Sequence, residues 1–246
     1  MPRYRITIEY DGGGFVGWQR QATGLTVQEA LEVGLEKLTG AVVRVQGAGR
    51  TDSGVHAIGQ VAHFDLPKLV PLKAIRDGVN FHMRPAPACI LDAEVVPDAF
   101  NARFSAISRR YRYRILNRRG PPMVDRGHVW FVPRPLDVPA MQAGAERLLG
   151  RHDFSSFRAI QCQANSPIRT MEHLTVTQHG DEIWIEAKAR SFLHKQIRIT
   201  VGTLLRVAEG AWTPDDVSQA LEAKNRIAAG QTAPSEGLCL MDVGYP

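Results

Sequence analysis

The stretch HLTVTQHGDEIWIEAKA, residues 173–189, predicts an antiparallel pair of strands and thereby decides the fold class. Apolar and polar residues alternate on both sides of His179-Gly180, as expected of two half-buried strands joined by a tight turn. Antiparallel strands can be joined by such a turn, whereas parallel strands need a long crossover. We therefore expect an α+β fold with mainly antiparallel or mixed sheets, rather than a doubly wound parallel sheet.

Further strands and helices are predicted on either side of this hairpin. RYRITIEY (3–10) alternates apolar with polar residues, which predicts a strand with one buried face. TVQEALEVGLEKLTG (26–40) predicts a helix that Thr26 caps and Gly40 ends. The remaining predicted strands are 41–46, 59–66, 88–96, 108–116 and 237–245, and the remaining predicted helices are 71–80, 137–150, 191–210 and 213–223.

These elements form two comparable halves, and the second series begins near residue 105. No linker rich in Pro, Gly or Ser separates them, so freely moving domains are not expected. We predict two α+β domains, residues 1–104 and 105–246.

The composition excludes several classes of protein. Hydrophobic residues make up 44% and charged residues 22%, which are ordinary values for a folded domain. Charged residues near the N-terminus interrupt any signal-peptide stretch, and no apolar run reaches membrane-spanning length. Cys89, Cys162 and Cys239 are far apart and odd in number, which argues against a disulfide framework and a zinc site. We expect a protein of the reducing cytoplasm, with no membrane partner and no metal.

Arginine dominates the positive charge, which is +5 overall. Lys accounts for only six of the 30 basic residues, and the range 103–119 contains seven arginines and no acid. Arginine presents a planar fork that suits phosphate and stacks on bases. A GC-rich genome would also raise the arginine content, but it would not cluster the residues. The cluster indicates a partner that is a polyanion.

The loop GAGRTDSGVHA (47–57) carries a single carboxylate, Asp52. Its glycine spacing fits neither the dinucleotide fingerprint nor a P-loop, and no metal-binding histidine spacing occurs in the chain. Ser53 and His56 do not form a recognisable triad with Asp52, because no G-x-S-x-G elbow is present. Two interpretations of Asp52 stay open: a turn-forming residue that bonds nearby backbone, or a lone nucleophile or base.

Two further stretches could carry function. In the predicted strand SRRYRYRIL (108–116), tyrosines alternate with arginines, which fits either a core face and a solvent face or an RNA-binding face with a stacking aromatic. In the predicted helix 191–210, His194 and Arg198 are four residues apart and are expected to share a face. That face could be merely solvated.

Taken together, these stretches resemble the TruA family of tRNA pseudouridine synthases. The resemblance runs through nearly the whole chain, and R-T-D-x-G-V-H-A is its most specific motif. The matching segments, in order, are YDGGGFVGWQRQ, TVQEALE, GAGRTDSGVHAIGQVAHF, FNARFSA, RRYRYRI, HDFSSFRA, SFLHKQIR and APSEGLCLMDVGY.

The resemblance implies an enzyme that isomerises uridine to pseudouridine at positions 38, 39 and 40 of the tRNA anticodon stem-loop, with base flipping and without a cofactor. The family's essential Asp corresponds to Asp52, acting as a nucleophile at C1′ or as a base at C2′. Its stacking tyrosine corresponds to Tyr111, and the arginine that pairs with the Asp corresponds to Arg198. Residues expected to contact the RNA are Arg50, His56, Arg110, Arg112 and Lys195.

The resemblance also implies two domains whose sheets join side by side, an active cleft between them, and a homodimer that binds tRNA. Ile199 and Ser235 depart from the family's usual residues, without touching the residues assigned to catalysis. Two competing functions are a tRNA-binding protein without catalysis and a retaining glycoside hydrolase. A tRNA-binding protein without catalysis would have no use for an acid near the phosphates, which it repels. A retaining glycoside hydrolase needs two carboxylates, and the loop supplies only one.

Overall fold

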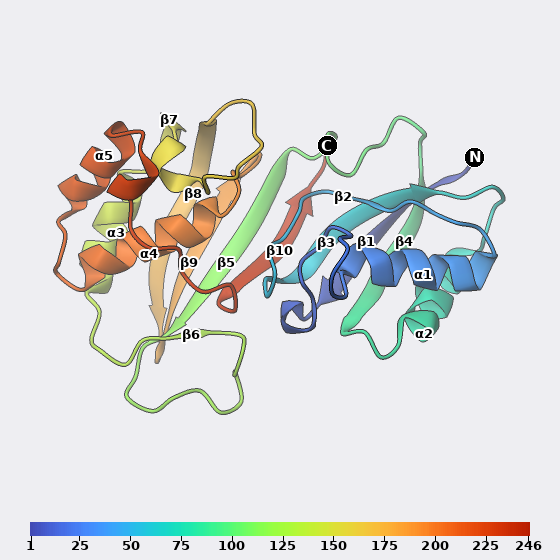
Figure 1. Cartoon of the computed structure of the whole chain (residues 1–246), viewed down its shortest axis with the longest axis horizontal. Helices are drawn as coiled ribbons and strands as arrows, with labels where there is room; N and C mark the ends of the chain where they lie inside the picture. The colour runs from blue at the N-terminus through green and yellow to red at the C-terminus, as the bar shows by residue number, and fades with distance from the viewer. The chain divides into compact units, whose positions relative to one another are not determined.

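The chain divides into two compact units, and each contains both strands and helices. The computed structural model describes all residues, 1–246 (Figure 1). Unit 1 comprises residues 1–107 and 239–246, and unit 2 comprises residues 108–238. The expected boundary lay after residue 104, with the C-terminal strand in the second domain. Residues 239–246 instead complete the sheet of unit 1.

The sheet of unit 1 has the order β4-β1-β3-β10. The strand β1 (Arg3–Tyr10) pairs antiparallel with both β4 (Ala88–Val96) and β3 (His56–Asp65). The last strand, β10 (Leu238–Gly244), runs parallel to β3, with Cys239 opposite His56. The predicted alternation of β1 is confirmed, because its apolar side chains are all buried: Tyr4, Ile6, Ile8 and Tyr10.

Two helices pack together in unit 1. The first, α1 (Val27–Thr39), begins after Thr26, whose hydroxyl accepts a hydrogen bond from the Glu29 N–H at 3.2 Å. It ends at Gly40, which is left-handed with φ +71°. Both predicted helix boundaries are thus confirmed. The second, α2 (Val79–Met83), follows a π-helical turn, Ala74–Gly78.

The predicted strand 41–46 is wrong for most of its length. Only Gln46 and Gly47 form a strand, β2, which pairs with β3. Side chains of α1 take the backbone groups that a strand partner would need. The Val45 N–H donates to the Glu32 carboxylate at 3.1 Å, and the Val45 carbonyl accepts from the Gln28 amide at 3.1 Å. Because those partners come from a helix, alternation in the sequence could not predict the outcome.

The sheet of unit 2 has the antiparallel order β5-β9-β8-β7. The expected hairpin is confirmed as β8 (Ile168–His179) and β9 (Glu182–Ala189), joined at Gly180, which has φ +60°. The strand β5 (Ser108–Leu116) also forms as predicted. Two short strands complete the sheet: β6 (Trp130–Phe131) beside β5, and β7 (Gly150–Asp153) beside β8.

Three helices belong to unit 2. They are α3 (Val138–Glu146), α4 (Gln196–Ala208) and α5 (Pro214–Glu222). As predicted, Asp137 caps α3, and its carboxylate accepts from the Ala140 N–H at 2.9 Å. The helix α3 packs against β8 and α4. None of the helices in the molecule combines the length and the apolar character needed to cross a membrane.

The helix predicted for 191–210 begins five residues later than expected. Lys195 has φ +61° and precedes the first helical residue, Gln196. The Gln196 side chain accepts from the Leu193 N–H at 2.8 Å, which holds the preceding segment in a turn. His194 therefore lies outside α4, and the prediction that His194 and Arg198 share a helix face is wrong.

Candidate functional site

The carboxylate of the 47–57 loop is carried on a tight turn immediately before β3. The Val55 N–H donates to the Asp52 carbonyl at 3.1 Å, which closes a four-residue β-turn with Asp52 first. Gly54, at the third position, has φ +76°, the positive value that type II turns require and that glycine adopts without strain. Asp52 itself is half-buried. The turn therefore fixes the backbone that carries this carboxylate.

The glycine-rich segment after β1 packs directly on this turn. A Cβ at Gly12 would lie 2.2 Å from the Val55 carbonyl oxygen, and a Cβ at Gly17 would lie 3.0 Å from the Thr51 carbonyl oxygen. The Trp18 N–H also donates to the Thr51 carbonyl at 3.1 Å. Gly12 and Gly17 are therefore needed for close backbone packing behind Asp52. In the sequence, the only signal of this packing is the density of glycines.

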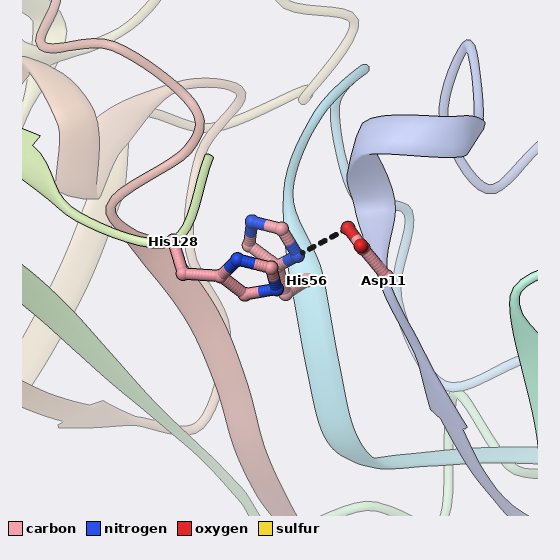
Figure 2. A group of neighbouring side chains, drawn as sticks. All are labelled: Asp11, His56 and His128. Atoms are coloured by element: carbon pink, nitrogen blue, oxygen red, sulfur yellow. Dashed lines mark ion pairs between the residues drawn. The ribbon is translucent and has the colours of Figure 1, made fainter. Parts of the chain in front are cut away.

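Buried polar contacts hold the residues on either side of Asp52. The Thr51 hydroxyl lies 2.8 Å from the Tyr10 hydroxyl. Figure 2 shows Asp11, from the end of β1, ion-paired with His56, from the start of β3. His56 Nδ1 lies 3.0 Å from the Gly12 N–H and 3.1 Å from the Asp11 carboxylate. Nδ1 cannot accept from the Gly12 N–H and donate to the Asp11 carboxylate at the same time. When Nδ1 carries no proton it accepts from Gly12, and when His56 is protonated Nδ1 donates to Asp11.

Arg50 and His56, both predicted to contact RNA, differ in exposure. Arg50 is exposed and forms no ion pair within the chain. His56 is buried, with 7% of its side chain exposed. His56 thus ties the start of β3 to the glycine-rich segment, whereas Arg50 presents a charge to solvent.

In unit 2, the two tyrosines of β5 point to the buried face of the sheet. Tyr111 is 9% exposed and meets Phe192 edge to face, with ring centroids 5.4 Å apart. Tyr113 is fully buried, and its hydroxyl donates to the Pro234 carbonyl at 2.8 Å. Burial raises the pKa of Tyr113, so this hydroxyl stays protonated and serves as a donor.

Three arginines of β5 lie on its other face and are paired with acids, mostly from β9: Arg110, Arg112 and Arg114. Arg112 is opposite Glu186 in the strand register and lies 2.8 Å from its carboxylate. Its guanidinium also covers the Trp184 ring at 3.9 Å. Arg114 contacts Glu182 at 2.6 Å and lowers the pKa of that carboxyl. The seven-arginine cluster is therefore not a region of unopposed positive charge, contrary to its appearance in the sequence.

Two more arginines follow the same pattern. Arg110 lies 3.8 Å from Glu186, and Arg118 lies 3.3 Å from Asp181. These acids come from the hairpin strand and its turn, more than 60 residues further along the chain. A count of charges within one window could not include them.

Arg198, on the first turn of α4, is bound to a loop that precedes β10. Its Nε donates to the Ala233 carbonyl at 2.8 Å, and the Ala233 N–H donates back to the Arg198 carbonyl at 3.0 Å. The next residue, Pro234, accepts from Tyr113. One short loop therefore holds both the guanidinium of α4 and a tyrosine of β5.

This loop lies against α4 at backbone distance. A Cβ at Gly202 would lie 1.9 Å from the Gln231 carbonyl oxygen, and a Cβ at Gly230 would lie 2.6 Å from the Gly202 carbonyl oxygen. The Gly230 N–H donates to the Thr203 hydroxyl at 2.9 Å. Arg226 stabilises the loop by donating to three of its oxygens, those of Ala229, Gly230 and Thr232. In the sequence, Gly202 is the only signal of this close approach between the loop and α4.

The predicted site residues are divided between the two units. Unit 1 contains Arg50, Asp52 and His56, and unit 2 contains Arg110, Tyr111, Arg112, Lys195 and Arg198. Lys195, in its left-handed conformation, forms no ion pair within the chain.

Comparison with known proteins gives a consistent result. A protein-family model described as tRNA pseudouridine synthase matches residues 6–105 and 145–246. The tRNA pseudouridine synthase A of Bradyrhizobium diazoefficiens is 57% identical over 245 residues, covering 100% of both chains. That of Paramagnetospirillum magneticum is 55% identical, covering 100% of this chain and 96% of the relative.

A solved structure was also matched. A chain of a Cbf5-Nop10-Gar1 complex aligns with 97% of this chain and 49% of its own length, at 12% identity and a TM-score of 0.36. That likeness is too weak to bear on function. The full-length identity to the relatives and the family match are decisive, and this chain therefore belongs to the TruA family of tRNA pseudouridine synthases, which are isomerases.

Proposed function

We propose that this chain isomerises uridine at positions 38, 39 and 40 of the tRNA anticodon stem-loop, and that Asp52 is its essential carboxylate. The observation that carries the proposal is the R-T-D-S-G-V-H-A motif on a backbone-closed turn, with glycines packed behind it. A reacting carboxylate must be aimed before the substrate arrives, and a turn closed by Gly54 and supported from behind supplies that preorganisation.

The reaction rearranges bonds without oxidation or group transfer. The C1′–N1 bond breaks, the base turns, and a C1′–C5 bond forms, while C5 loses a proton and N1 gains one. Asp52 would either attack C1′ as a nucleophile or remove a proton from C2′. Both routes need an ionised carboxylate at the sugar. Neither needs an electron carrier, and we propose no cofactor.

Tyr111 and Arg198 are proposed to complete the site. The edge-to-face contact with Phe192 restrains the Tyr111 ring, which would stack on the flipped uracil. With Nε held by the Ala233 carbonyl, the plane of the Arg198 guanidinium is restrained as well. Pairing of Arg198 with Asp52 would keep the carboxylate ionised. This proposal requires an active cleft to which both units contribute.

We propose that a homodimer recognises tRNA by its shape and phosphates. Reaching three neighbouring uridines is compatible with backbone contacts and is incompatible with strict base reading. Arg50 and Lys195 form no ion pair within the chain and are proposed as the main phosphate contacts. Arg110 and Arg112 would be secondary, because phosphate must compete with Glu186 for them. His56 would act by holding the Asp52 turn.

A comparison of Arg50→Ala with Arg112→Ala tests this ranking. Arg50→Ala should weaken tRNA binding and lower the slope of log K against log salt by about one, because one phosphate contact is lost. Arg112→Ala should leave the slope nearly unchanged but reduce the free energy of unfolding by about 1 kcal/mol, because a cross-strand pair and a cation–π contact disappear. Filter binding at several salt concentrations and urea unfolding measure the two effects. An equal decrease in the slope of log K against log salt in both variants would contradict the ranking.

Tritium release from tRNA labelled at uridine C5 tests the proposed reaction directly. Transcripts with the labelled uridine only at position 38, 39 or 40 should each release tritium to solvent, because C5 gives up its hydrogen when it bonds to C1′. A transcript labelled only at another position should release none. Free uracil in place of pseudouridine would indicate a glycosidase, and binding without release would indicate a non-catalytic RNA-binding protein.

A further inference from the structure

A rigid turn in unit 1, residues 101–105, displays a large aromatic side chain to solvent. Phe104 is 72% exposed, although the flanking Ala102 and Ala106 are buried. An isolated exposed apolar residue needs no explanation by itself. The way in which this turn is built and anchored does need one.

The Asn101 side chain organises the turn. Its carbonyl oxygen accepts from the Arg103 N–H at 3.0 Å and from the Phe104 N–H at 3.1 Å. The Asn101 N–H donates to the Ser105 hydroxyl at 3.0 Å, and the Ser105 N–H donates to the Asn101 carbonyl at 2.9 Å. Four hydrogen bonds thus fix the backbone that carries Phe104.

The turn is also anchored to the sheet through Ala102. The Ala102 N–H donates to Nδ1 of His63 on β3 at 3.1 Å, and the Ala102 carbonyl accepts from the Tyr245 hydroxyl at 2.7 Å. His63 is 2% exposed, and burial lowers its pKa, so the neutral ring accepts this bond at neutral pH. The backbone turn that carries the exposed ring is therefore anchored by buried contacts to β3 and to the residue that follows β10.

The surroundings of the ring suit a nucleic acid. The Arg103 guanidinium lies over the Phe104 ring, 5.5 Å from its centroid. A planar cation on one side of an exposed aromatic ring forms a platform on which a base can stack, and a preorganised platform loses little entropy on binding.

We propose that Phe104 is a nucleobase-stacking contact for bound tRNA, separate from the catalytic assignment of Tyr111. The ligand class is an unpaired or terminal base whose flat face lies on the Phe104 ring, with Arg103 behind it. This inference rests on the tRNA substrate of the proposed function. In this proposal Phe104 touches no reacting atom of the uridine, and it contributes only to the affinity for tRNA.

Phe104→Ala tests the proposal against a matched control. Phe81, on α2 of the same unit, is also an exposed phenylalanine, at 65%, and its ring meets only the neighbouring His82, edge to face. Phe104→Ala should weaken tRNA binding about tenfold by filter binding, since a stacked base contributes on that scale, whereas Phe81→Ala should bind like the wild type. Phe104→Trp should restore the affinity, and Phe104→Leu should not, because leucine keeps the apolar surface without the π-face.

Two further measurements identify the cause of a lost affinity. The salt dependence of binding should keep the wild-type slope in Phe104→Ala, because no phosphate contact is removed. At saturating tRNA, Phe104→Ala should release tritium with the wild-type kcat. If the proposed reaction itself is wrong, the wild type will release no tritium. The two failures are therefore distinguishable. Three outcomes would each overturn the proposal. They are wild-type tRNA affinity in Phe104→Leu, a loss of affinity in Phe81→Ala equal to that in Phe104→Ala, and a loss of affinity in Phe104→Ala that is caused by dissociation of a dimer.

Discussion

Asp52→Ala should release no tritium above background from C5-labelled tRNA while still binding it. We expect kcat to fall by about 10⁴-fold or more, the scale on which removal of a catalytic nucleophile or base acts in other enzymes. The affinity for tRNA should hold or rise, because a negative charge close to phosphates is removed. Single-turnover release and filter binding on the same preparation measure both quantities.

The backbone of the turn should survive this substitution. The turn is closed by the Asp52 carbonyl and by Gly54, and Asp52→Ala keeps both. The melting temperature should therefore stay close to that of the wild type. Asp52→Asn, which preserves shape and removes charge, should be as inactive as Asp52→Ala. Turnover by either variant at more than about a hundredth of the wild-type rate would refute an essential carboxylate, given the magnitude expected for such a group.

Gly202→Ala should severely destabilise unit 2 and impair catalysis in the molecules that still fold. The new Cβ would lie 1.9 Å from the Gln231 carbonyl oxygen, so α4 and the loop before β10 would have to separate. We expect a loss of about 3 kcal/mol in the free energy of unfolding, at the upper end of what overpacking a core does. Urea unfolding measures it.

The catalytic effect follows from what the loop holds. Separation from α4 would strain or break the reciprocal Arg198–Ala233 hydrogen bonds, so kcat should fall more than tRNA affinity. Gly120→Ala is the matched control, because nothing lies within 4 Å of a Cβ there. Its stability should equal that of the wild type or exceed it slightly. Wild-type stability in Gly202→Ala would show that α4 and the loop are not in backbone contact.

Local patterns predicted those elements whose partners are close in sequence or whose own side chains decide the structure. The β8–β9 hairpin followed from alternation and a two-residue turn, and the alternation of β1 marked its buried face. The limits of α1 followed from Thr26 and Gly40, since caps act on their own helix. The motif around Asp52 indicated the reaction because it is the most specific part of a resemblance to one family that extends along nearly the whole chain.

Only the tertiary structure decided features whose partners are distant in sequence. Residues 41–45 look like a strand, but Gln28 and Glu32 of a helix bind their backbone. The arginines of β5 look like an RNA-binding surface, but Glu182 and Glu186 on the neighbouring strand pair with them. Such pairings are set by the strand register and by helix packing, which bring together groups that no sequence window contains.

The same distinction holds for the candidate site. The sequence by itself determined the family and the reaction class and led to the proposal of Asp52 as the carboxylate, because these depend on the kinds of residues present and on their order. The tertiary structure decided what holds those residues: Gly12 and Gly17 behind the Asp52 turn, and the loop at 229–234 against α4. Each support is a contact between backbones far apart in the chain, and such contacts depend on which side chains are small or absent.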